Sequence, residues 1–339
     1  MPPRLKSALS VAASLALAAG LLYLALRDAD LGAVGAALAA GSWGWLVPFV
    51  AVAVASVVVR AWRWGLLIGA LPGRPRAGLA LTSAAVAVGY LVNYAAPRLG
   101  EVARTAAVAR RTEATFSGVL GTVVAERLLD VVAMAAILAA VTVAYRDRVG
   151  AVWAEAAEGA AALLSALPVA AVAAVAVALA LAAAGAWAVA RRRGAGRLAD
   201  LAGAFRDGLA TLLRTGRTPA LLSSTAVLWL CYALMTDLPF RLLGMDRAFG
   251  LGLGEAWAVM AVGGIGMALP APGGTGSFHY ATVLALTLLF AVPATPAATY
   301  AILVHAAGLV FYAVLGGAAL VWQGVGLAAA TRAPRAEPS

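Results

Sequence analysis

Long apolar stretches recur along this chain of 339 residues, and they decide what it can fold into. A helix rises 1.5 Å per residue, so about 20 apolar residues span the hydrocarbon core of a bilayer. Hydrophobic residues make up 63% of the chain and charged residues only 12%, which excludes an ordinary soluble enzyme. The sequence therefore predicts an all-α, polytopic integral membrane protein with about eight transmembrane helices. The expected spans are residues 8–26, 43–70, 117–145, 166–190, 219–240, 254–270, 276–292 and 297–323.

The first apolar run follows Arg4 and Lys6 and has two interpretations. It is either a signal peptide with an Ala16-x-Ala18 cleavage site or a first spanning helix. We favour the helix, because the run is longer than the apolar region of most signal peptides.

Two features flank the second span. Residues 27–40 read as a short surface helix, and Trp43 and Trp45 then open the span. At its other end, Arg60, Trp62, Arg63 and Trp64 are interpreted as the point where the span meets a membrane interface.

Residues 77–96 are apolar but end in polar residues and a proline, so we expect a broken or re-entrant element there. Two arrangements are open. In one, eight spans cross and 77–96 is a hairpin that does not cross. In the other, six spans cross and two re-entrant pairs, 77–111 and 254–292, enter the membrane without crossing it.

The net charge of +10 comes from 24 arginines and one lysine against 15 acids. In a membrane protein this excess indicates positive loops facing anionic lipid rather than nucleic acid. The segment 191–217 is the most basic and has apolar residues at helical spacing, which predicts an interfacial helix in a cytoplasmic loop. We expect one transmembrane domain over 1–325, a disordered tail over 326–339, both termini in the cytoplasm and a location in the cell inner membrane.

One cysteine, Cys231, excludes an internal disulfide, and two histidines, His279 and His305, are too few for a Cys/His metal cluster. We therefore expect no cofactor and no metal.

A first polar cluster lies where the surrounding sequence indicates membrane. Pro97 and Gly100 interrupt a helix, and Arg98, Glu101 and Arg104 recur every three residues on one helical face. With Asn93, this cluster is interpreted as an anion site that carries its own carboxylate. The alternative is a solvated cytoplasmic loop with a surface salt bridge.

A second cluster, Glu126, Arg127 and Asp130, lies inside the 117–145 span. Three ionised residues cost roughly 8–10 kcal/mol near the membrane centre, more than the about 4–7 kcal/mol that the twelve Val, Leu and Ile of the span return. The cluster must therefore be buried against partners or a wet cavity. It is either part of a substrate pathway or a structural ion-pair network.

A third cluster joins the short segments 254–270 and 276–292. Pro272, Gly273, Gly274 and Gly276 break the helix, and their free backbone N–H groups suit an anionic headgroup. The alternative is a tight turn between two spans. His279, which follows, is either a packed core histidine or a proton relay.

The first and third clusters echo each other. Ala87-Val88-Gly89 stands ten residues before Pro97, and Ala261-Val262-Gly263 stands nine before Pro270. Interrupted segments at corresponding places in two halves are typical of inverted-repeat transporters, so we treat an inverted repeat as a hypothesis.

The three clusters, in this order and separation, resemble the flippase-like family related to the transmembrane region of lysylphosphatidylglycerol synthases, over about residues 5–325. The resemblance implies a bacterial inner-membrane protein that moves an amphipathic lipid between leaflets. Family members have been linked to aminoacylated phosphatidylglycerol, polyisoprenoid-linked sugars and hopanoids.

Two departures limit what the resemblance implies. The sequence up to Ser339 has no counterpart of the soluble aminoacyl-transferase domain, so lysyl transfer is not expected. His279 stands where the family's glycine motif is usually followed by a glutamate.

The leading hypothesis is a lipid translocator rather than an enzyme, with a membrane lipid as substrate. Arg98 and Arg104 would hold the lipid phosphate, and Glu101, Glu126 and Asp130 would balance the arginines, meet a cationic headgroup or carry protons. The alternatives are a membrane-embedded transferase with Glu126 and Asp130 as base or metal ligands, and a scaffold of an envelope-lipid synthesis complex. Envelope-lipid biosynthesis proteins or a second copy of the chain are the other expected partners.

Overall fold

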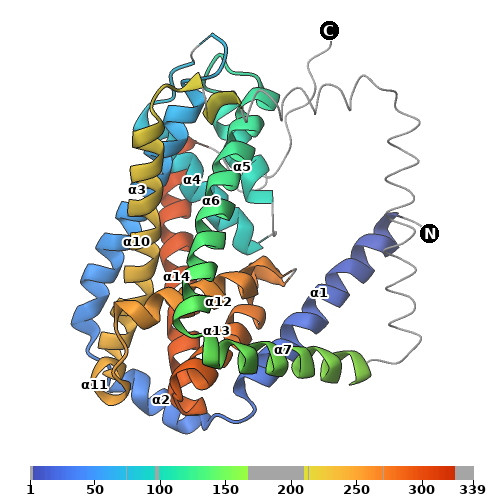
Figure 1. Ribbon diagram of the computed structural model, residues 1–339. Helices are drawn as coiled ribbons and strands as arrows, with labels where there is room; N and C mark the ends of the chain where they lie inside the picture. Colours follow the sequence, from blue (N-terminus) through green and yellow to red (C-terminus); the bar gives the residue numbers. More distant parts are fainter. Residues whose placement is uncertain are drawn as a thin grey trace.

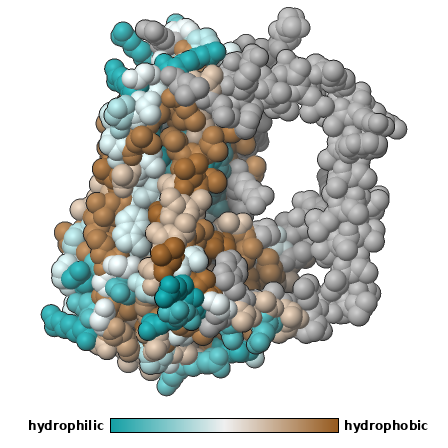
Figure 2. Space-filling view, viewed as in Figure 1, coloured by the Kyte–Doolittle hydropathy of each residue, from teal (hydrophilic) through white to brown (hydrophobic). Residues whose placement is uncertain are grey.

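The computed structural model describes residues 3–73, 75–95, 99–166, 210–212, 214–269 and 271–324, and every regular element in these ranges is a helix. Within these described ranges, four helices are long and apolar enough to cross a membrane: α3 (Leu46–Ile68) with the short η1 (Trp43–Trp45) before it, α6 (Phe116–Ala144), α10 (Thr218–Leu242) and α14 (Ala294–Gln323). They run along a common direction (Figure 1). A brown apolar band lies between teal polar ends in Figure 2, as expected for a protein that spans a bilayer.

Two helical hairpins enter this bundle. The first consists of α4 (Leu79–Ala95) and α5 (Leu99–Ala109), and the second of α12 (Leu253–Ala268) and α13 (Ser277–Phe290), with η2 (Pro272–Gly274) at its tip. The longest of these helices, α4, has 17 residues and is about 26 Å long, which is less than the roughly 30 Å of a bilayer core. These lengths favour the arrangement in which 77–111 and 254–292 are re-entrant pairs.

Small residues let the two arms of each hairpin approach closely. A Cβ atom on Gly100 of α5 would overlap the carbonyl oxygen of Gly89 on α4. In the second hairpin, a Cβ on Gly266 would lie 2.5 Å from the carbonyl oxygen of Ser277. In both hairpins, a glycine thus allows the backbones of the two helices to pack closely.

The order helix, hairpin, helix occurs twice in the chain. The units are α3, α4–α5, α6 and α10, α12–α13, α14; α3 packs on α4, and α10 packs on α12. The α4–α5 hairpin lies in the upper half of the bundle and the α12–α13 hairpin in the lower half (Figure 1). Two apolar cores lie in the bundle, one around Trp64 with residues mainly of the first unit and one around Tyr300 with residues mainly of the second. This order and placement are what the inverted-repeat hypothesis predicts.

Shorter elements surround the repeats. The first apolar run is the helix α1 (Pro3–Leu26), which packs on α13, and the expected surface helix is α2 (Leu31–Ala39), capped by the carboxylate of Asp30. α11 (Met245–Phe249) lies between α10 and α12 in the chain.

One helix was not expected from the sequence. α7 (Arg146–Ala166) lies across the lower end of the bundle (Figure 1) and packs on α13, where the hydroxyl of Tyr280 donates to the carbonyl of Glu155. The predicted span 166–190, the interfacial helix 191–217 up to the start of α10 and the tail 326–339 lie outside the described residues, apart from short pieces.

Candidate functional site

The charged residues of α3 and α6 face each other inside the bundle. Arg60 and Arg63 lie one turn apart on α3, and Glu126 and Asp130 lie one turn apart on α6. Arg60 contacts Glu126 at 3.0 Å and Asp130 at 2.7 Å, while Arg63 contacts the same two carboxylates at 3.3 and 2.7 Å. The four side chains form a buried square of alternating charge.

The first hairpin adds two more charged residues from α5. Arg104 contacts the second oxygen of Glu126 at 2.8 Å, and Glu101 pairs with Arg127 of α6 at 2.6 Å. Arg127 also lies 3.5 Å from Asp130. We call the full set the charge cluster; its members are Arg60, Arg63, Glu101, Arg104, Glu126, Arg127 and Asp130.

Neutral side chains hold the arginines in place. The guanidinium of Arg104 lies over the ring of Trp64, 4.7 Å from its centroid, and the indole N–H of Trp64 donates to Thr122 at 2.9 Å. Arg63 donates to the hydroxyl of Thr225 on α10 at 3.0 Å. Because α10 belongs to the second repeat, this bond ties the two repeats together at the charge cluster.

The charge cluster carries one excess positive charge, from four guanidinium groups against three carboxylates. Its hydrogen bonding within the described part of the chain is also incomplete: Arg60 Nε, Arg63 Nε and Arg104 Nη2 are buried guanidinium nitrogens without a partner there. One acceptor, Glu101 Oε2, has no partner among the described residues either. Buried donors without acceptors are costly, so the cluster is suited to an anion.

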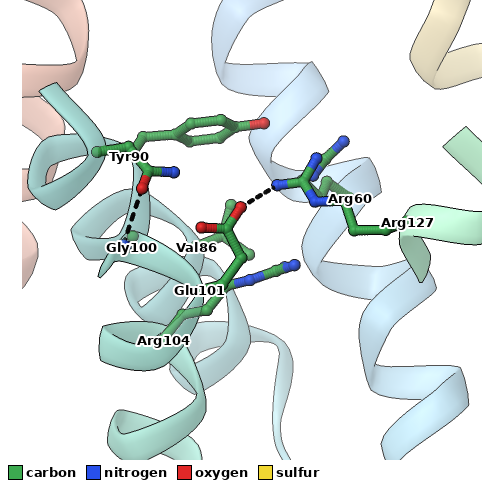
Figure 3. Close-up of a pocket in the computed structure, with 9 residues that line it drawn as sticks. Arg60, Val86, Tyr90, Gly100, Glu101, Arg104 and Arg127 are labelled. Atoms are coloured by element: carbon green, nitrogen blue, oxygen red, sulfur yellow. Dashed lines mark hydrogen bonds and ion pairs between the residues drawn. The ribbon is translucent and has the colours of Figure 1, made fainter. Parts of the chain in front are cut away.

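A small cavity lies beside the charge cluster (Figure 3). Its volume is about 10 Å³, which is room for about one water molecule. The lining residues come from α3, α4, α5 and α6, and they are Arg60, Val86, Gly89, Tyr90, Asn93, Gly100, Glu101, Arg104 and Arg127. In Figure 3 the carboxylate of Glu101 points toward Arg127, and the N–H of Gly100 donates to the side-chain oxygen of Asn93 at 2.8 Å.

The structure brings the first and second predicted clusters together. Asn93, Gly100, Glu101 and Arg104 of the first meet Arg127 of the second around the cavity. Glu126 is fully buried and Asp130 nearly so, each against arginines. The predicted site residues Pro97 and Arg98 lie outside the described residues.

The third cluster forms a separate site at the tip of the second hairpin. Pro272, Gly273 and Gly274 form η2, Gly276 caps α13, and His279 lies in the first turn of that helix. None of these residues lines the cavity beside the charge cluster. The two sites meet through Tyr94 of α4: a Cβ on Gly273 would lie 3.0 Å from its ring.

The interpretation of residues 60–64 as a membrane interface is wrong for three of the four residues. Arg60, Arg63 and Trp64 are buried, and only Trp62 is exposed. These arginines are the functional candidates that sequence reasoning missed. The signal was present: two carboxylates on one face of the 117–145 span need cations on another span, and Arg60 and Arg63 have the matching one-turn spacing.

The helical membrane fold agrees with a comparison to protein families. Comparison with curated proteins and with solved structures found no significant match. The profile of one family, described as the lysylphosphatidylglycerol synthase TM region, matches residues 11–316 and so covers both repeats and all three polar clusters. The chain therefore belongs to the lysylphosphatidylglycerol synthase transmembrane-region family.

Proposed function

We propose that this membrane protein moves an amphipathic lipid with an anionic, phosphate-bearing headgroup between the two leaflets of the bilayer. The observation that carries the proposal is the excess positive charge of the charge cluster, with its three unpartnered guanidinium nitrogens. A phosphate group in the cavity would supply the missing charge and would offer acceptors to Arg60 and Arg104, which line it. A phospholipid, an isoprenoid-linked lipid phosphate and a lipid with a phosphorylated sugar share this chemistry.

The residues of the charge cluster have different roles in the proposed transfer. Arg104 and Arg60 are the phosphate ligands, because both line the cavity and both keep a free nitrogen. Glu101 holds Arg127 and keeps one oxygen for a cationic part of the headgroup or for a proton. Glu126 and Asp130 hold the arginines apart and fix their orientation.

Movement of the lipid requires the cavity to open. A volume of about 10 Å³ holds one water molecule and no phosphate headgroup, so the described arrangement is a closed state. The hairpins are the elements suited to open it, because Tyr94 near the end of α4 lies against Gly273 at the tip of the second hairpin. The acyl or isoprenoid chains would stay in the bilayer, since burying them among charges is unfavourable.

The charge distribution supports an orientation in the cell inner membrane. At the end of the bundle where α3 ends and α10 begins, the loops carry Arg76, Arg110, Arg111, Arg214 and Arg217. Glu113 is their one acid among the described residues. The positive-inside rule assigns this end, together with the C-terminus and the N-terminus, to the cytoplasm. Anionic lipid of the inner leaflet is the natural partner of these loops.

The transferase alternative finds less support in the geometry. A general base or metal ligand needs a carboxylate oxygen that is free to act. Glu126 is engaged by Arg60, Arg63 and Arg104, and Asp130 is engaged by Arg60, Arg63 and Arg127. Both carboxylates are therefore better placed to hold arginines than to take part in chemistry.

The test is lipid equilibration between leaflets in proteoliposomes. Phosphatidylglycerol with a fluorescent label on an acyl chain is quenched from outside by dithionite, and loss of the protected half reports transfer. We expect the wild type to speed the loss, and Arg104→Gln to slow it about tenfold or more, because a charged hydrogen bond contributes about 1.5–3 kcal/mol. Arg217→Gln, at an exposed loop position, is the matched control and should keep the wild-type rate.

Mass spectrometry of co-purifying lipids provides a second reading. A phosphate-bearing lipid enriched on the wild type and lost from Arg104→Gln would identify the substrate class. Monodispersity by size-exclusion chromatography separates loss of function from loss of fold. A wild type no faster than empty vesicles, or a monodisperse Arg104→Gln at full rate, would refute the proposal.

A further inference from the structure

The chain has two histidines, and the structure places them against each other. His279 lies in the first turn of α13 and His305 in the middle of α14, and their ring centroids are 4.7 Å apart. His279 is buried. The pair sits beside the tip of the second hairpin, on the far side of Tyr94 from the charge cluster.

Each histidine is engaged with the broken tip of the hairpin. The N–H of Gly276 donates to Nδ1 of His279 at 3.3 Å, so this nitrogen carries no proton in the described state. Nε2 of His305 lies 3.5 Å from the hydroxyl of Thr275. Gly276 has a φ of 81° and packs closely against the backbone of Ala18 on α1. This packing restricts movement of the hairpin tip.

The groups around the pair are mostly uncharged. From α4 comes the phenol of Tyr94, whose ring is 6.1 Å from that of His305, and from α13 itself comes Phe278, whose ring is 5.9 Å from that of His305. α1 and α12 present Ala18, Leu22 and Met267 to the hairpin tip. On α7, which also packs on α13, the backbone carbonyl of Glu155 accepts from the hydroxyl of Tyr280. Among the described residues, no carboxylate forms an ion pair with either histidine.

The pair occupies the place in the second repeat that the charge cluster occupies in the first. His279 follows the break of its hairpin as Glu101 and Arg104 follow theirs, and His305 lies midway along α14 as Glu126 lies midway along α6. One repeat thus carries fixed charges. The other carries two imidazoles, the side chains whose ordinary titration lies between about pH 5 and 8.

We propose that His279 and His305 together form a proton-binding site that couples lipid movement to proton movement across the membrane. The inference rests on the proposed function and adds the coupling ion. The pair binds one proton at a time, because two positive charges at this separation repel each other in an environment without a carboxylate partner.

Proton binding changes the contacts at the hairpin tip. A proton taken from water on one side of the membrane adds to the lone pair of His279 Nδ1, which then cannot accept the N–H of Gly276. The positive charge also lies in the first turn of α13, where the helix dipole disfavours it. The protonated pair therefore favours a rearranged tip, and release of the proton to water on the other side restores the bond.

Tyr94 is the contact through which this rearrangement reaches the lipid site. Its ring lies against Gly273 of the second hairpin, and its hydroxyl lies 3.0 Å from where a Cβ of Gly308 on α14 would be. It is the neighbour of Asn93, which lines the cavity of the charge cluster. A shift of the second tip must therefore move the end of α4.

The experiment imposes a pH gradient on proteoliposomes that contain labelled phosphatidylglycerol, with the membrane potential clamped by potassium and valinomycin. The readout is the share of label in each leaflet at steady state. For one proton per lipid, one pH unit shifts the ratio between leaflets by up to about tenfold. We expect this shift in the wild type, and a ratio near one, reached at a retained rate, in His279→Gln and His305→Gln. Tyr280→Phe, on the neighbouring position of α13, is the matched control and should keep the shift.

The outcomes separate the two proposals. A wild type that equilibrates the label without any shift overturns proton coupling and leaves the proposed function standing. A shift that persists in both histidine variants, or that protein-free vesicles reproduce, also overturns it. A wild type that does not speed equilibration at all overturns the proposed function. If His279→Gln is misfolded by size-exclusion chromatography, His305→Gln decides, since its side chain contacts the tip only at 3.5 Å.

Discussion

Removing the carboxylate of Glu126 tests whether the charge cluster is a dry, interdependent network. Glu126 is fully buried and contacts three arginines, Arg60 at 3.0 Å, Arg63 at 3.3 Å and Arg104 at 2.8 Å. In Glu126→Gln the amide keeps one acceptor oxygen, but its NH₂ group faces a guanidinium. Breaking a buried pair in this way costs about 3–5 kcal/mol, because the remaining charges stay buried without compensation.

The comparison variant is Glu101→Gln at the edge of the same cluster. The Glu101 and Arg127 side chains are 24% and 43% exposed, so solvent screens this pair and its loss should cost about 0–1 kcal/mol. The assay is the free energy of unfolding by steric trapping in bilayer discs, supported by thermal unfolding in detergent. A second variant, Glu126→Gln with Arg63→Met, removes one cation together with the anion. It should recover about 1 kcal/mol or more of the loss.

The reasoning fails if Glu126→Gln and Glu101→Gln are destabilised equally, or if Arg63→Met adds its own full cost to that of Glu126→Gln. Either result would mean that water, rather than the neighbouring carboxylates and arginines, compensates the charges. Glu126→Gln and Glu101→Gln each neutralise one carboxylate, so a general effect of net charge cannot explain a difference in stability between these two variants.

The remaining predictions concern the tips of the two hairpins. Gly100→Ala places a methyl group onto the carbonyl of Gly89, so we expect loss of several kcal/mol of stability, on the scale of overpacking plus backbone displacement, measurable by steric trapping. Gly276→Ala combines a φ of 81° with overlap of the Ala18 backbone, and we expect α1 to separate from α13, which faster hydrogen exchange in residues 14–26 would report. Wild-type exchange in Gly276→Ala, or an unchanged stability of Gly100→Ala, would contradict the described packing.

Much of the fold could be predicted because the length of a membrane-spanning helix and the breaks in it are set by residues that are close together in the sequence. The spans at α3, α6, α10 and α14 follow from apolar length alone. The hairpin tips follow from prolines and glycines between short apolar segments. α7 was missed because its mixed alanine and acidic sequence has neither the apolar length of a span nor a strong turn signal.

The site was predicted in part for a related reason. Glu126 and Asp130 stand out because their cost inside a span is visible in the local sequence. Arg60 and Arg63 lie in a region where arginine and tryptophan are equally typical of a membrane interface, and only the packing of α3 on α6 distinguishes the two cases. His305 was not predicted as a site residue, because a single histidine in a span gives no sign of its partner; the pairing with His279 arises from the fold.

The small volume of the cavity beside the charge cluster bears on whether ions can pass through the protein. A space that admits about one water molecule is too small for a sodium or potassium ion with its hydration shell, so no hydrated ion fits the cavity beside the charge cluster in this state. Five of the seven members of the charge cluster are buried, and each of these is held by oppositely charged side chains rather than by bulk water. The proposed function therefore predicts that ion leakage is confined to the openings that lipid transfer requires, and that its rate rises and falls with the rate of transfer.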